Sequence, residues 1–139
     1  MAVTAAFTNQ AKLDMLQGIH AAADVYKVAL YTQAAASLDK TSTTYSTTGE
    51  LPTANGYTQG GQVLAGYAAA LSGDTAYIDW TTDPAWAAAT ITADAAVIYN
   101  SSKSNKIVAV LTFTSASSTN GTWTLQLPAP GATAVVRIA

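Results

Sequence analysis

The sequence predicts a single, mainly β domain: an antiparallel β-sandwich or barrel-like fold with one short N-terminal α-helix. Helical periodicity is clear only once, near the start of the chain. Short segments that alternate apolar and polar residues dominate the second half, and Gly, Pro, Asn and Asp separate them. The length of 139 residues suits one domain (1–139), and the absence of cysteine excludes disulfides.

The first twenty residues predict an arm followed by a helix. Residues 1–7 are predicted to form an N-terminal arm. Thr8 can cap a helix, and the residues after it place an apolar face at three- and four-residue spacing, made of Ala11, Met15, Leu16 and Ile19. We therefore predict a helix over 8–20. Phe7 is either an anchor that binds a partner or the apolar residue that packs on the first helical turn.

The middle of the chain predicts one strand and a long loop. Residues 26–31 alternate, as expected for a strand with one buried face and one mixed face. Residues 32–61 have no period and are rich in Ala, Thr, Ser and Gly. Structureless connections of about thirty residues are uncommon in compact domains. This loop is therefore either ordered by a partner, or a loose surface connection with a short edge strand inside it.

Residues 75–138 predict a strand-rich core. Strands are expected at 76–80, 89–93, 95–99, 107–113, 122–127 and 134–138, with a hairpin turn at 100–105. Trp80 and Trp123 are in phase with apolar neighbours and are predicted to be core residues. Leu125, Leu127 and Val136 continue the core face of Trp123, and Thr122, Thr124 and Gln126 form a neutral face opposite. Trp86 follows Pro84 in a bend and is expected to reach the surface.

Charged residues make up only 10% of the chain, and the stretch from Ile107 to Val136 contains no charged residue or histidine. An ordinary soluble domain has roughly 25% charged residues, so this surface must be mostly neutral and suits contact with other proteins. A net charge of −2 with scattered basic residues argues against nucleic-acid binding. We also expect no membrane span and no cleaved signal peptide, with synthesis in a cytoplasm.

Residues that could carry chemistry are few. His20 is the only histidine and is expected at a helix end, where the dipole favours it, rather than as a general base. Asp79 alternates with Ile78 and Trp80, so it should face solvent. Two further groups are assigned to turns or match no known calcium or phosphate loop: the aspartates Asp74, Asp79, Asp83 and Asp94, and the glycines Gly56, Gly60 and Gly61. We therefore predict no catalytic residue, no cofactor, no metal and no enzymatic activity.

Five segments carry a resemblance to a known group of proteins: VYKVALY (25–31), GYTQGG (56–61), DPAW (83–86), AVIYN (96–100) and KIVAVL (106–111). Together they resemble small virion proteins of tailed bacteriophages, and the likeness extends from about Phe7 to Arg137. The resemblance implies a non-enzymatic structural protein, expected to be a capsid cement or decoration protein. Its partners would be the major capsid protein, bound from outside the head, and copies of itself, expected as a homotrimer.

The residues that we expect at such contacts are Val3, Phe7, Tyr45, Tyr57 and Trp86. Exposed apolar and aromatic side chains are the usual anchors of protein interfaces. The arm and the long loop are where we expect ordering on the capsid. The alternative is a carbohydrate- or receptor-binding module on a fibre, neck or tail, with Trp86 as its aromatic contact.

Overall fold

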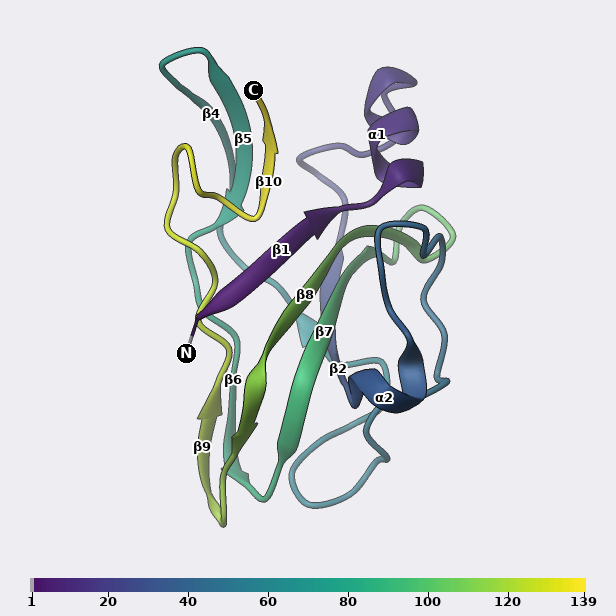
Figure 1. Cartoon of the computed structure of the whole chain (residues 1–139), viewed down its shortest axis with the longest axis vertical. Helices are drawn as coiled ribbons and strands as arrows, with labels where there is room; N and C mark the ends of the chain where they lie inside the picture. Colours follow the sequence, from purple (N-terminus) through teal and green to yellow (C-terminus); the bar gives the residue numbers. More distant parts are fainter. Residues whose placement is uncertain (1) are drawn as a thin grey trace.

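The protein is mainly β, with antiparallel strands (Figure 1). The computed structural model describes residues 2–139, so Met1 of the predicted arm lies outside the described residues. The elements in chain order are β1 (Val3–Phe7), α1 (Asn9–Leu16), β2 (Tyr26–Tyr31), α2 (Gln33–Ala36), β3 (Gln62–Val63), β4 (Tyr67–Ser72), β5 (Thr75–Trp80), β6 (Ala85–Ala89), β7 (Thr92–Asn100), β8 (Lys106–Ser117), β9 (Gly121–Thr124) and β10 (Val136–Ile138).

The largest sheet has the strand order β1-β8-β7-β2-β3. The predicted hairpin turn at 100–105 is confirmed, because Asn100 pairs with Lys106 and β7 and β8 run antiparallel from there. Their Val, Ile and Tyr residues suit a pleated, packed surface. Two smaller sheets, β10-β5-β4 and β6-β9, complete the fold. The three sheets are open, so the barrel-like alternative is wrong.

Both faces of the main sheet are buried at its centre. Val28, Leu30 and Ile98 pack into the larger core cluster on one face. Ala29, Tyr31, Val97 and Tyr99 pack into a second cluster on the other face. The prediction of a half-buried β2 with one mixed face is therefore wrong, because α2 and the residues after it supply Ala36, Leu38 and Tyr45 as a cover for the second face.

The long segment 32–61 holds the helix α2 and otherwise irregular chain. Its attachment to the sheet is direct: the Tyr45 ring stacks on Tyr99 with centroids 4.5 Å apart, and Thr44 forms a bridge with Lys106 at the start of β8. Aromatic stacking at this spacing adds to the free energy of burial. The segment is thus packed against its own sheet rather than left as a loose connection.

The predicted N-terminal arm is corrected over residues 3–7, which form strand β1. β1 pairs with β8 in the register Val3↔Phe113 to Phe7↔Ala109. The partner that orders these residues is therefore the chain's own β8. The sequence gives no alternation strong enough to predict this edge strand, since Ala5 and Ala6 carry little hydrophobic contrast.

The predicted helix begins as expected and ends four residues early. Thr8 Oγ1 accepts a hydrogen bond from the Ala11 N–H at 3.2 Å, which confirms the cap. Gly18 has φ of +67°, and the N–H groups of Gly18 and Ile19 donate to the carbonyls of Met15 and Asp14. This paired pattern is the Schellman motif that closes helices at a glycine, so α1 ends at Leu16 and His20 lies beyond it.

The tryptophans meet in the larger core cluster. Trp80 and Trp123 are buried, as predicted. The expectation that Trp86 is exposed is wrong: it is 7% exposed, pairs with Trp123 across β6 and β9, and contacts it edge to face at 5.7 Å. The prediction that Asp79 faces solvent is also wrong: Asp79 is buried, because the last residues of β5 enter the core and both faces of the strand are covered there.

Candidate interaction surface

A buried ionic cluster joins the end of α1 to the β7–β8 hairpin. Asp14 Oδ2 lies 3.4 Å from His20 Nε2, and Asp14 Oδ1 lies 3.7 Å from Lys106 Nζ. Asn100 Nδ2 donates to Asp24 Oδ2 and contacts His20 Nδ1 at 3.0 Å. Burial lowers the pKa of His20, although Asp14 opposes this shift. The ring is enclosed, so this cluster holds the fold together and offers no open site.

A second polar cluster is centred on Glu50, the only glutamate. Its Oε1 accepts hydrogen bonds from the Tyr57 hydroxyl and the Gly60 N–H, both at 2.7 Å, and its Oε2 accepts from the Tyr45 hydroxyl at 2.5 Å. Tyr57 Oη also accepts from the Leu30 N–H at 2.9 Å. We call these three side chains, Tyr45, Glu50 and Tyr57, the Glu50 clasp. It fixes the long segment to β2.

The glycines of segment 56–61 take the backbone role that was predicted. All three have positive φ, and a Cβ added at Gly61 would lie 1.7 Å from the Val28 carbonyl oxygen. Gly61 is therefore required for the close approach of this segment to β2. Within residues 2–139, the acidic residues and His20 form no group of three that could hold a metal ion.

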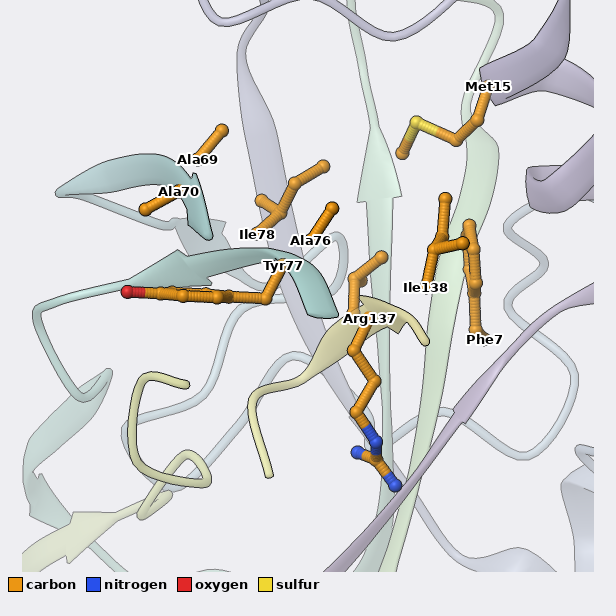
Figure 2. A pocket seen from close by; sticks show the side chains of 10 residues that line it. Phe7, Met15, Ala69, Ala70, Ala76, Tyr77, Ile78, Arg137 and Ile138 are labelled. Carbon is orange, nitrogen blue, oxygen red and sulfur yellow. The ribbon is translucent and has the colours of Figure 1, made fainter. Parts of the chain in front are cut away.

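An apolar groove of about 190 Å³ lies between α1 and the β10-β5-β4 sheet (Figure 2). Figure 2 shows Met15 of α1 pointing toward Ile138 and Phe7, with Ala69, Ala76 and Ile78 on the far side. Of the predicted apolar face of α1, Ala11 is fully buried, whereas Met15 borders this groove. Met15 is only partly buried and Leu16 is 87% exposed.

The sheet side of the groove is one continuous apolar face. Antiparallel partners lie on the same face, and Ala69 pairs with Ile78, Leu71 with Ala76, and Ile138 also with Ala76. This face runs outward to the tip of the β4–β5 hairpin, where Leu71 is 74% exposed. We call the surface formed by Ala69, Leu71, Ala76, Ile78, Val136 and Ile138 the apolar face.

Basic residues border the groove. Lys12 and Arg137 line its neighbouring depressions, and Lys40 lines one of them. Three of the six basic residues of the chain therefore gather at one edge of an apolar surface. In Figure 2 the guanidinium of Arg137 points away from the apolar side chains, and its Nη1 donates to the Ala134 carbonyl.

The opposite end of the molecule exposes mostly neutral side chains. β6, β9 and residues 114–120 lie there (Figure 1), and none of these segments carries a charged side chain. Thr122, Thr124 and Gln126 are exposed, while Trp123 and Leu125 between them are buried, which confirms the predicted alternation. We call this region the neutral end.

The structure separates the five predicted contact residues. Tyr57 and Trp86 are buried in the core cluster, so neither is available to a partner, and Tyr45 is held in the Glu50 clasp. Val3 is partly buried on β1. Phe7 lines the apolar groove. Sequence reasoning missed β4 and Leu71, because the run of alanines at 68–70 hides the strand.

Comparisons of the chain with protein-family models, curated proteins and solved structures find no match. Neither helix within residues 2–139 combines the length and apolar character needed to cross a membrane.

Proposed function

We propose that the chain is a non-enzymatic structural protein of a tailed-bacteriophage virion, a cement protein that binds the outside of the major capsid protein lattice. The observation that carries the proposal is the neutral end, whose strands β6 and β9 carry no charged side chain and whose edge holds a single exposed carboxylate, Asp83. Burying these strands requires no desolvation of ions, which suits the core of a protein interface. The resemblance of five segments to small virion proteins supports the choice of a virion.

The fold is compatible with this role as a sandwich-like unit that presents different surfaces at its two ends. The main sheet and its covers hold those surfaces apart: β6 and β9 lie at one end of the molecule, and α1, β4 and β10, which border the groove, lie at the other (Figure 1). A protein that bridges identical subunits gains affinity when several copies bind at once. Thr and Ser side chains of the neutral end can exchange hydrogen bonds with the lattice.

The alternative is a carbohydrate- or receptor-binding module, and the structure removes the aromatic contact on which carbohydrate binding depended. Sugar rings stack on exposed aromatic faces, but Trp80, Trp86 and Trp123 are each at most 7% exposed. Trp86, the aromatic contact that this alternative required, packs inside the core.

The test is addition of the purified protein to phage heads that lack it, followed by electron microscopy of the particles. We expect density in a regular array on the outer head surface. Thr122→Glu combined with Thr124→Glu should reduce occupancy at least tenfold, because two charges would be buried without partners. Thr44→Glu is the matched control, since Thr44 is exposed and lies at the other end of β8. Absence of array density, or equal loss in the control, would overturn the proposal.

A further inference from the structure

We infer that the apolar groove binds the β4–β5 hairpin tip of a second copy of this chain. The inference deepens the proposed function and rests on it for the premise that the groove is an intermolecular surface. The apolar face extends past the groove to Leu71, which protrudes at the tip with 74% of its surface exposed. Contiguous exposed apolar surface, unlike a single exposed residue, is typical of interaction sites, and the apolar face joins Leu71 to the groove.

The groove and the tip are complementary in shape and polarity. The groove is lined by Met15, Phe7 and Ile138, and a neighbouring depression shares these three residues and adds Leu16. Leu16 and Ile138 are largely exposed. The tip offers one large aliphatic side chain on a narrow two-residue turn, because Ser72 pairs with Thr75 around Gly73 and Asp74. A narrow turn with a single leucine fits a groove of this size better than a broad surface does.

Charge complementarity supports the β4–β5 hairpin tip of a second copy as the partner that binds the groove. Asp74 follows Leu71 by three residues, is exposed, and has no ion pair within residues 2–139. Lys12 is exposed beside Leu16 in the depression next to the groove, and it is likewise without an ion pair in that part of the chain. A docked tip that places Leu71 against Met15 and Leu16 brings Asp74 to the α1 side of the groove. In that position the Asp74 carboxylate lies near the Lys12 ammonium group, and the attraction between the two charges favours this partner.

Two other exposed apolar residues that lie away from the groove, Val25 and Val63, do not offer this pairing. Val25 is next to Asp24, but Asp24 already contacts Lys103 Nζ at 3.5 Å and accepts from Asn100. Val63 is 57% exposed on β3, at the far edge of the main sheet, and has no acidic neighbour in sequence. The hairpin tip therefore combines an exposed leucine with an unpaired carboxylate, as the groove requires.

The experiment is sedimentation velocity of the purified full-length chain over a wide concentration range, with circular dichroism to confirm folding of each variant. We expect the wild type to self-associate. Leu71→Ser should weaken association about 10- to 100-fold, the loss expected when one leucine is no longer buried. Val63→Ser is the matched control, and it should leave association unchanged. A monomeric wild type, or equal effects of the two variants, would overturn the inference.

A charge exchange tests the partner contact directly. Asp74→Lys and Lys12→Asp should each weaken association, and the double variant should recover most of the loss because the pair is restored with reversed signs. Failure of the double variant to recover affinity contradicts the assigned pair. A chain that stays monomeric yet decorates heads overturns this inference alone, whereas a chain that self-associates yet leaves heads bare overturns the proposed function alone.

Discussion

Removal of one hydroxyl from the Glu50 clasp should destabilise the whole domain. Tyr57→Phe keeps the ring, which packs 6.0 Å from Trp86, and deletes two hydrogen bonds. The Tyr57 hydroxyl donates to Glu50 Oε1 at 2.7 Å and accepts from the Leu30 N–H at 2.9 Å. Leu30 is fully buried, so water cannot replace the lost acceptor.

The magnitude follows from these two losses. A buried N–H left without an acceptor costs about 1–3 kcal/mol, and the lost hydrogen bond to Glu50 adds about 0.5–1.5 kcal/mol. Glu50 keeps its bonds to Tyr45 and Gly60, so no unpaired carboxyl group is added to the cost. We expect the free energy of unfolding to fall by about 3 kcal/mol.

The assay is urea denaturation followed by tryptophan fluorescence. With a urea slope of about 2 kcal/mol per molar, the midpoint should fall by about 1.5 M. Tyr45→Phe is the control: it deletes only the bond to Glu50 Oε2 from a half-buried ring, so its cost should stay near about 1 kcal/mol. Equal midpoints for the two variants would refute the importance assigned to the Leu30 N–H.

Three further changes test other parts of the fold. Burial raises the pKa of the Asp79 carboxyl group, so the native state binds the carboxyl proton more tightly than the unfolded chain does. Asp79→Asn should therefore raise the free energy of unfolding at pH 7. This gain in stability should vanish near pH 3. Burial lowers the pKa of His20, so the stability of the fold should decline as the pH falls below 6.5. In thermal melts between pH 7 and 5.5, the melting temperature of His20→Gln should depend less on pH than that of the wild type. Gly61→Ala should cost about 2–5 kcal/mol in urea titrations because its Cβ would meet the Val28 carbonyl, whereas Gly73→Ala, with positive φ and open space, should cost about 1 kcal/mol.

The strands that alternate with strong contrast were predictable from sequence, and those built from alanine were not. Trp123 and Leu125 alternate with Thr and Gln neighbours, so the sequence predicted both their strand and its buried face. β4 reads Tyr-Ala-Ala-Ala-Leu-Ser, and alanine fits either face of a sheet, so the period of two disappears. β1 was missed for the same reason.

The groove could not be predicted because its lining comes from distant parts of the chain. Phe7, Met15 and Ile138 meet only after β1 has paired with β8 and β10 with β5. The sequence did place Met15 and Leu16 on one apolar helix face. Whether that face is packed or open depends on tertiary structure, which the helix period alone does not determine.

The pairing of β1 with β8 also has a consequence for the order of events during synthesis. Val3 pairs with Phe113, so β1 must wait after its synthesis for roughly a hundred further residues, about 5–20 s at ordinary translation rates. The β7–β8 hairpin is local and can form as soon as both strands exist. Docking of β1 is then a late step, and the groove that Phe7 lines cannot be complete before it. Assembly through the groove would therefore be restricted to chains whose folding is already finished.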